Sequence, residues 1–485
     1  MTALPFAILI PLAGAVLIVF ARQHPAIRDT VTLATATLLF AAVATLAPAV
    51  FNGARPTLTL AEPLPGLALQ LTVEPLGMLF ALLASLLWVI TTIYSIGYMR
   101  ALHERHLARF YSCFALSLWA TMGMAFAGNL LTLFVFYEVL TLVTYPLVTH
   151  AGTERAKRSG RIYLGLLLGT SVCFLLLAII WTWWLAGTLD FTRGGILHGT
   201  ASPLLLGCLL ALYVFGIGKA ALMPFHRWLP AAMVAPTPVS ALLHAVAVVK
   251  GGVFFILKVA IYVFGIDLLA ELQATQWLLY VAATTILLAA LVALRQDNLK
   301  LRLAYSTISQ LGYIVLGTLL ANAAGIMGSA MHIATHAFGK ITLFFCAGAI
   351  LVRTRKTLVS ELAGIGRSMP WTMGAFAIAS LAMIGMPPTA VFVSKWYIFL
   401  GVVDAGQLVA LAALLLSTLL NAGYLLPVVY TAFFDAPGEA AGDTHGEAPP
   451  AILLALGMTT LGTLALFFFP DILLALASQL AGPGT

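Results

Sequence analysis

Long apolar runs, separated by short polar segments, repeat along nearly the whole chain. A helix needs roughly 20 apolar residues to cross the hydrocarbon core of a bilayer, and about fourteen runs meet this requirement. They begin near Ala3, Asp29, Glu74, Phe110, Leu130, Ile162, Ser202, Val239, Gln276, Leu303, Met327, Trp371, Gln407 and Ala451. The pattern predicts an all-α, polytopic membrane protein with about 14 transmembrane helices and no separate soluble domain.

The composition and the positions of the charges support this prediction. Hydrophobic residues make up 62% of the 485 residues, whereas a soluble globular protein has about 45–50%. Of the 24 Lys and Arg residues, only Arg55 and Arg193 fall in the even-numbered loops. Basic residues concentrate in cytoplasmic loops, so we expect the odd-numbered loops in the cytoplasm and both termini outside. The net charge of +7 therefore indicates membrane orientation rather than nucleic-acid binding.

One apolar run contains a lysine, Lys219, and is then interrupted by prolines. The prolines that follow are Pro224, Pro230, Pro236 and Pro238. A proline inside a helix removes a backbone hydrogen bond, and irregular backbone at membrane depth is tolerated only inside protein or beside a water-filled cavity. An ionisable residue at such a place indicates an ion or proton route. We therefore expect a broken helix here, with Lys219 in a functional site.

The run that begins near Leu130 carries one carboxylate near its middle, Glu138. Lys219 is its expected partner, because an opposite charge offsets the cost of burying a carboxylate. The alternative is that Glu138 only ties helices together through hydrogen bonds. A glutamine would serve that purpose without the cost of a charge.

The run that begins near Val239 carries three further ionisable residues, His244, Lys250 and Lys258. Lys250 lies several turns inside its span, at about 1.5 Å per residue, so its ammonium cannot easily reach the membrane surface. Lys258 lies nearer the outer end, and we expect it to extend to the interface. For His244 two interpretations stay open, a hydrogen-bonded core residue or a member of the proton path.

A third apolar run contains His332, His336 and Lys340, which recur every four residues. This spacing places all three on one face of a helix. Two histidines four residues apart could bind zinc, but the sequence offers no third ligand. A proton relay is the better interpretation, because imidazole both accepts and donates protons near neutral pH.

The run that begins near Trp371 repeats the arrangement around Lys219, since Pro387 and Pro388 interrupt it and Lys395 follows. Paired interrupted helices in two halves of a chain indicate inverted repeats. We therefore expect two inverted five-helix repeats, formed by helices 4–8 and 9–13. The expected division is 1–109 for the scaffold helices 1–3, 110–265 for the first repeat, 266–433 for the second, and 434–485 for an acidic loop with helix 14.

The chain shows no pattern that would hold a cofactor or a metal ion. Its cysteines stand singly in apolar runs, without the CxxC spacing of iron–sulfur or zinc sites. We therefore expect no cofactor and no metal. Any electron transfer would belong to partner proteins, so whether the chain is part of an enzyme stays open.

Four stretches of this chain form a specific set of motifs. They read GKAALMPFHRWLPAAMVAPTPVSALLHAVAVVKGGVF, DNLKLRLAYSTISQLGY, THAFGK and GMPPTAVFVSK. This set resembles the antiporter-like membrane subunits shared by respiratory complex I, Mrp-type cation/proton antiporters and membrane-bound hydrogenases. The resemblance implies the following roles: a charge pair for Glu138 and Lys219, a connecting residue for Lys250, a central relay for His332, His336 and Lys340, and a terminal lysine for Lys395.

The resemblance also implies a function, that of a proton-translocating subunit of a multi-subunit complex in a bacterial or archaeal cell membrane. Ala231 stands where complex I members usually carry an acidic residue, which favours a D-type Mrp subunit or a hydrogenase subunit over an NADH:quinone oxidoreductase subunit. Expected partners are other membrane subunits, the lipid bilayer and protons, with Na+ as a second candidate ion and no nucleic acid. A passive membrane scaffold is the alternative. It is disfavoured because each intramembrane charge costs about 2.5–3.5 kcal/mol on insertion scales.

Overall fold

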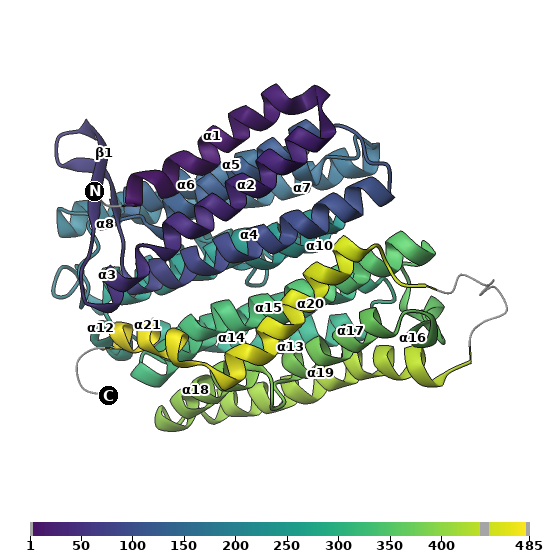
Figure 1. The fold of residues 1–485 in the computed structure, drawn as a ribbon. Coiled ribbons are helices and arrows are strands. Elements are labelled where there is room, and N and C mark those ends of the chain that lie inside the picture. The colour runs from purple at the N-terminus through teal and green to yellow at the C-terminus, as the bar shows by residue number, and fades with distance from the viewer. Residues whose placement is uncertain (1–2, 437–445, 482–485) are drawn as a thin grey trace.

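The computed structural model describes residues 3–436 and 446–481, apart from the side chains of Leu64 and His244. Its helices lie side by side along the long axis of an elongated bundle (Figure 1). The first five helices are α1 Leu4–Phe20, α2 Pro25–Ala44, α3 Ala47–Phe51, α4 Pro75–Ala101 and α5 Leu107–Ala125. Proline stands in the first turn of α1 to α4, where its missing N–H has no helical partner to lose.

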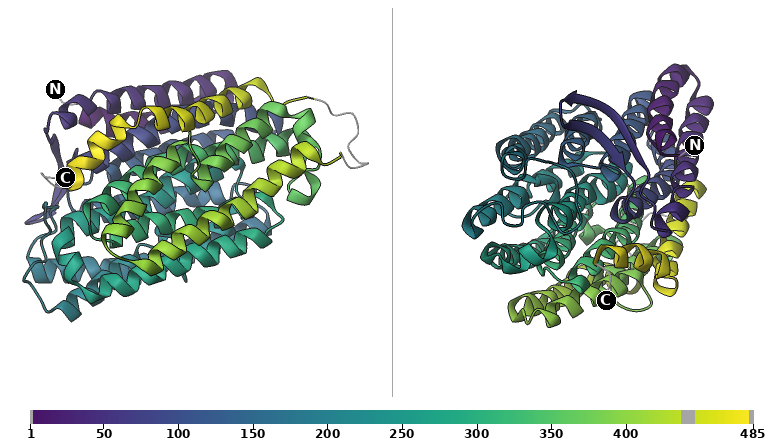
Figure 2. Two further views of the ribbon diagram at one scale, coloured as in Figure 1. Left: turned by 90° about the horizontal axis from the view of Figure 1, so that it is seen from below. Right: turned by 90° about the vertical axis from the view of Figure 1, so that its left-hand side faces the viewer.

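A two-stranded hairpin connects α3 to α4 and covers one end of the bundle. Strand β1, Thr57–Leu64, pairs with the antiparallel strand β2, Leu67–Thr72. The arrows in Figure 2 (right) lie across the ends of the helices, so we call this the hairpin end. Helix α1 begins and α21 finishes at the hairpin end (Figure 1). Among the described residues, this hairpin is the one β-sheet in an otherwise helical fold.

The middle third of the chain contains most of the irregular helices. Its α-helices are α6 Leu130–Val148, α7 Glu154–Thr170, α8 Leu176–Ala186, α9 Pro203–Gly216, α10 Trp228–Ala231, α11 Val248–Lys258 and α12 Ile266–Glu271. Three π-helical segments join them, at Ser171–Leu175, Val239–Ala247 and Val259–Phe264. Two of these segments flank α11, and π-helical insertions are frequent at functional sites.

The last third consists of long helices and one interrupted pair. Its helices are α13 Gln273–Arg295, α14 Leu299–Leu319, α15 Ala323–Thr354, α16 Ile365–Ser368, α17 Pro370–Ile384, α18 Ala390–Asp404, α19 Leu408–Phe434, α20 Pro450–Phe468 and α21 Asp471–Ala481. The side chains of Asn298 and Asn322 accept backbone N–H bonds in the first turns of α14 and α15. These N-caps fix where the two polar helices of the site begin.

Ten helical stretches among the described residues are long and apolar enough to cross a membrane. The remaining runs of the sequence pattern correspond to interrupted helices, as at α9 and at α17 with α18, or to the more polar helices α5 and α14. Nearly every residue of α14 is buried, so its polar groups face protein. The predicted class, an all-α multi-pass membrane protein, is confirmed.

Burial increases from the edge of the bundle to its centre. Helices α1 and α19 expose large apolar side chains, such as Phe20 and Leu419, as lipid-facing helices do. By contrast, the most apolar stretch of Val239–Phe264 is entirely buried, and that of α15 is 89% buried. The two helices that carry Lys250, the α15 histidines and Lys340 therefore lie in the interior of the protein.

Candidate functional site: a chain of buried ionisable residues

Helix α9 ends at Gly216, and the chain turns at once into a short 3-10 segment, Gly218–Ala220, that carries Lys219. The Trp228 indole donates to Gly218 O at 2.9 Å, which satisfies a carbonyl freed by the break. On the other side, Gly252 of α11 packs directly on this turn, since a Cβ at Gly252 would lie 2.3 Å from Ala220 N. The predicted interruption is present, and it holds Lys219 at the centre of the first half of the bundle.

The Lys219 ammonium is fully buried and directed at α6. It donates to Tyr137 O at 2.7 Å and to Thr141 Oγ1 at 2.5 Å. It also lies 3.1 Å from the centre of the Tyr137 ring, a cation–π geometry. Two oxygens and an aromatic face therefore stabilise a charged group that could not otherwise remain in the interior.

Glu138 follows Tyr137 on α6 and lies close enough to Lys219 for the two charges to interact. The structure does not place the two groups in an ion pair, because Lys219 bonds the neighbouring carbonyl instead. Both Glu138 carboxylate oxygens are buried without a hydrogen-bond partner among the described residues. A buried carboxylate in this condition is costly, so it requires a proton, a water molecule or a movement of Lys219.

In the second cluster, Lys250 of α11 contacts Nδ1 of His336 on α15 through its ammonium nitrogen. The side chains of both residues are fully buried. His336 Nε2 has no partner among the described residues. His336 can therefore receive a proton on one side of its ring and release one on the other.

The three ionisable residues of α15 reach three different neighbouring elements. The rings of His332 and His336 stack with centroids 5.6 Å apart. His332 Nδ1 lies 2.9 Å from Ser394 Oγ of α18, and its Nε2 lies 3.1 Å from Gln310 Oε1 of α14. Lys340 donates to Ser306 Oγ of α14 at 2.7 Å. The shared face expected from the four-residue spacing is thus a polar seam at the centre of α15.

Polar contacts continue from Lys340 towards Lys395. The Tyr424 hydroxyl lies 2.8 Å from Ser306 Oγ and also contacts Asn421 Oδ1. Because a phenol carries one proton, it can donate to only one of these two oxygens, and the Ser306 hydroxyl supplies the other bond. Asn421 Nδ2 then donates to Met383 O at 3.4 Å, and Lys395 Nζ donates to the same carbonyl at 2.9 Å.

Lys395 lies where the second interrupted helix breaks. Its ammonium donates to Met383 O and, at 3.1 Å, to Ile384 O. These are the last carbonyls of α17, which a helix end leaves unsatisfied and partially negative. Unlike the other four intramembrane lysines, Lys395 is only partly buried, and it borders a groove of about 230 Å³ with Tyr313 and Trp396.

The Lys219 cluster and the Lys250 cluster are not linked by hydrogen bonds between described residues. The space beside Gly251 is occupied by Met124 and Leu140, both apolar. His244 precedes Lys250 by six residues, but its side chain lies outside the described residues, so its predicted role is not addressed by the structure. Among the described residues, the ionisable residues singled out in the sequence therefore form two groups, separated by the apolar side chains of Met124 and Leu140.

One expectation from the sequence is wrong. Lys258 does not extend to the membrane surface but is fully buried, in an ion pair with Glu74 at the start of α4. It also donates to Ala127 O at 2.8 Å and lies 4.3 Å from the centre of the Phe191 ring. A buried carboxylate partner removes the need for Lys258 to reach water.

Several contact residues had no separate signal in the sequence, notably Tyr137, Thr141, Asn421 and Tyr424. Hydroxyl and amide groups are common in membrane helices, where they bond their own backbone, so only the fold distinguishes these four. Glu74 is different, because it is a carboxylate at the edge of an apolar run. It stands at the predicted start of a span, and nothing in the sequence pairs it with Lys258.

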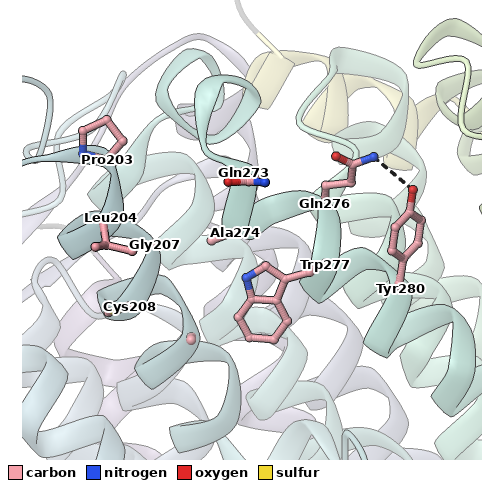
Figure 3. A pocket seen from close by; sticks show the side chains of 10 residues that line it. Pro203, Leu204, Gly207, Cys208, Gln273, Ala274, Gln276, Trp277 and Tyr280 are labelled. Carbon is pink, nitrogen blue, oxygen red and sulfur yellow. Dashed lines mark hydrogen bonds between the residues drawn. The ribbon is translucent and has the colours of Figure 1, made fainter.

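The surface also contains a pocket of about 550 Å³ between α9 and α13. Figure 3 shows that Trp277 and Tyr280 line it together with Leu204 and Cys208, and that Gln276 bonds Tyr280. None of the predicted path residues borders this pocket. It is therefore separate from the chain of ionisable residues.

Together, the two broken helices and the buried ionisable residues define a class of protein, a polytopic membrane protein with ionisable groups in its interior. Residues 127–421 match the transmembrane family described as NADH:quinone oxidoreductase/Mrp antiporter. The chain belongs to this family, which confirms the resemblance inferred from its motifs. It is thus an antiporter-like subunit of the proton-translocating type.

Two curated relatives represent two kinds of complex. NADH-quinone oxidoreductase subunit N of Desulforudis audaxviator is 33% identical over 393 residues, which cover 80% of this chain and 77% of that protein. The probable A/B subunit of a K(+)/H(+) antiporter of Rhizobium meliloti is 32% identical over 399 residues, covering 81% of this chain and 39% of that protein. The chain likewise spans half or less of the NAD(P)H-quinone oxidoreductase chain or subunit 5 relatives that it matches.

Two solved structures are similar over nearly the whole chain. One is a chain of the membrane-bound sulfane sulfur reductase, an archaeal respiratory membrane complex, with a TM-score of 0.87 and 24% identity over 99% of this chain and 98% of that one. The other is a chain of the Mrp complex from Dietzia sp. DQ12-45-1b, with a TM-score of 0.86 and 23% identity over 99% and 96%. These two matches establish the antiporter-like fold.

Proposed function

We propose that the chain translocates protons as one subunit of a multi-subunit complex in a bacterial or archaeal inner membrane. The observation that carries this proposal is the set of buried lysines and histidines described above. Lys219 and Lys395 lie at helix breaks, and His332, His336 and Lys340 lie on the continuous helix α15. The path would consist of Glu138, Lys219, Lys250, His332, His336, Lys340 and Lys395, with His244 as a further candidate.

The chemistry of the path follows from the chemistry of a buried lysine. Desolvation disfavours the ammonium form, whereas nearby oxygens or a carboxylate favour it, so a small movement changes whether the group holds its proton. Lys219 stands between two such environments, the oxygens of Tyr137 and Thr141 and the unpaired carboxylate of Glu138. Closing the Glu138–Lys219 pair would retain a proton on Lys219, and opening it would release the proton towards Lys250.

The proposed architecture is two inverted five-helix repeats, 110–265 and 266–433, within about fourteen spans, a number that follows from roughly 20 residues per crossing. Scaffold helices at 1–109 and a final segment at 434–485 complete the proposed division. The main support is that Lys219 and Lys395 each lie at a break in a helix. The distribution of basic residues supports an orientation with the hairpin end, and both termini, outside the cell.

Two kinds of complex are candidates for the partners. The subunit N relative and the sulfane sulfur reductase belong to redox complexes, and the antiporter relative and the Mrp complex to cation/proton antiporters. The motif departure at Ala231 favours a role like that of a D-type Mrp subunit or of a hydrogenase subunit. Purification of the intact complex distinguishes the two, because NADH- or hydrogen-oxidising subunits indicate the former and small multi-span subunits alone the latter. Sodium-dependent pH change in vesicles tests whether Na+ is the exchanged ion.

The experiment that tests proton translocation is proton uptake by inverted vesicles carrying the whole complex. Lys219→Ala and Glu138→Ala are expected to abolish uptake while the complex still assembles. Lys157→Ala is the matched control, because Lys157 is exposed and its one ion pair among the described residues is with Glu154, at 2.8 Å. Full uptake in both path variants would contradict the proposal and favour a passive scaffold.

A further inference from the structure

The path described above does not use one buried ion pair, Lys258 and Glu74. We infer that this pair is an additional proton-transfer station, which connects Lys250 to the hairpin end of the bundle. The inference rests on the proposed function, since it extends the same path. It is carried by the position, burial and surroundings of the two side chains.

Lys258 and Lys250 lie on the same helix, α11, eight residues apart. Eight residues rise about 12 Å and, at 3.6 residues per turn, rotate the side chain by about 80°, so the two lysines leave the helix on adjoining sides. A separation of this size is too long for direct transfer, so bridging water or intervening movement is required. The π-helical segments on both sides of α11 provide backbone that is less regular than an α-helix, and therefore easier to rearrange.

The two members of the pair differ in exposure. The exposed fraction of the side chain is 1% for Lys258 and 9% for Glu74. The carboxylate is therefore the more exposed of the two groups, and Lys258 is the one that shares a helix with Lys250. The Tyr262 ring lies beside the pair, with its centre 5.5 Å from Lys258 Nζ.

The cover over this pair is built from residues of several loops. The N–H of Ile196 donates to Val263 O at 2.8 Å, so the loop after α8 is fastened to the end of the π-helix. Gly195 and Gly265 both have positive φ angles, and a Cβ at Gly265 would lie 2.1 Å from Gly194 O. Only glycine allows these two backbones to approach so closely.

Above this cover, the only two basic residues of the even-numbered loops meet at one place. Arg55 Nη2 donates to Gln479 Oε1 at 2.9 Å, and Arg193 Nη2 donates to Gln479 O at 3.1 Å. The two arginines therefore bring positive charge to the hairpin end of the bundle, where α21 finishes.

The proposed step is balanced in protons. The Lys258 ammonium gives one proton to the Glu74 carboxylate, which leaves a neutral amine and a neutral carboxylic acid. Glu74 releases this proton to water at the hairpin end and regains its charge. Lys258 then takes a proton that originates from Lys250, and the ion pair is restored.

Two variants of opposite design test this step. Lys258→Arg keeps a positive charge beside Glu74, but a guanidinium does not deprotonate in proteins. The double variant Glu74→Met/Lys258→Met removes both charges, and apolar replacement of a buried ion pair is often neutral or stabilising. A purely structural pair therefore predicts normal transport in at least one variant. A proton station predicts that transport falls at least about tenfold in both, since a positioned proton-transfer group usually contributes more than that.

The measurement is proton uptake by vesicles carrying the complete complex, with thermal stability and subunit composition measured on the same preparations. Wild-type uptake in either assembled variant would overturn the inference, and if one variant fails to assemble, the other decides. Lys219→Ala is measured in parallel. If Lys219→Ala abolishes uptake and the Lys258 variants do not, only this inference fails; if Lys219→Ala transports normally, the proposed function fails.

Discussion

Lys219 donates a hydrogen bond to the main-chain carbonyl of Tyr137, the residue directly before Glu138. The ammonium thus lies beside its expected partner without pairing with it. The carbonyl and Thr141 hold the lysine in one position, and the unpaired Glu138 carboxylate offers a second. This arrangement has the two alternative contacts that a switch in proton affinity requires.

Thr141→Val is expected to slow proton uptake several-fold and to lower stability. Valine has nearly the shape of threonine but cannot accept the Lys219 bond, and hydrogen bonds to charged groups contribute about 1.5–3 kcal/mol. Uptake by vesicles and thermal unfolding of the purified complex measure the two effects. Thr91→Val is the control, because the Thr91 hydroxyl bonds only its own helix, at Leu87 O. Equal uptake in both variants would show that Thr141 does not position Lys219.

Tyr424→Phe is expected to reduce uptake while changing stability by only about 1 kcal/mol, the usual net contribution of one hydrogen bond. The hydroxyl joins Ser306, the partner of Lys340, to Asn421. Its removal interrupts the contacts between Lys340 and Lys395 and leaves the lysines in place. Tyr213→Phe is a matched control, since Tyr213 is equally buried and its hydroxyl lies 2.6 Å from Thr182 Oγ1, away from the path. Loss of uptake in the control alone would contradict this assignment.

The buried ionisable residues stood out in the sequence because a charge in an apolar run has few structural uses. Lys219 and Lys395 stood beside prolines, and the structure places each at a helix break. The four-residue spacing on α15 likewise predicted one polar face. Each of these features depends on residues that are close together in the sequence, so the sequence alone was enough to predict it.

The features that escaped prediction depend on residues distant in sequence. Lys258 appeared close to the membrane surface because its partner, Glu74, lies in another helix, 184 positions earlier. The direction of the Lys219 ammonium was equally hidden, because a main-chain carbonyl as acceptor leaves no trace in sequence. The hairpin, in contrast, could have been predicted from the sequence, because Thr57–Leu64 opens with alternating polar and apolar residues before the turn at Gly66.

Gly252→Ala is expected to destabilise the protein by about 1–3 kcal/mol, the usual cost of overpacking, and to reduce uptake. The added methyl group would meet Ala220 N and push the turn that carries Lys219. Gly457→Ala is the control, because a Cβ there has no atom within 4 Å among its described surroundings. Thermal unfolding separates the variants, and a Gly252→Ala protein with wild-type stability and uptake would show that the turn tolerates displacement.

His150 lies in the turn after α6 and provides a prediction outside the membrane-spanning segments. Burial, together with the positive charge of Arg109, lowers the pKa of His150 to about 4, so the folded protein holds this imidazole neutral at pH values where the unfolded chain binds a proton. The unfolded value is about 6.5, so the stabilisation is complete above that pH and declines as the pH falls from 6.5 towards 4. The slope reaches at most about 1.4 kcal/mol of stability per pH unit.

Thermal unfolding of the wild type at pH 7.5, 6 and 5 should show this decline in stability. His150→Asn should reduce the decline. The control variant His198→Asn, at an exposed position, should leave it unchanged. An identical pH dependence in the wild type and His150→Asn would mean that other groups determine acid stability.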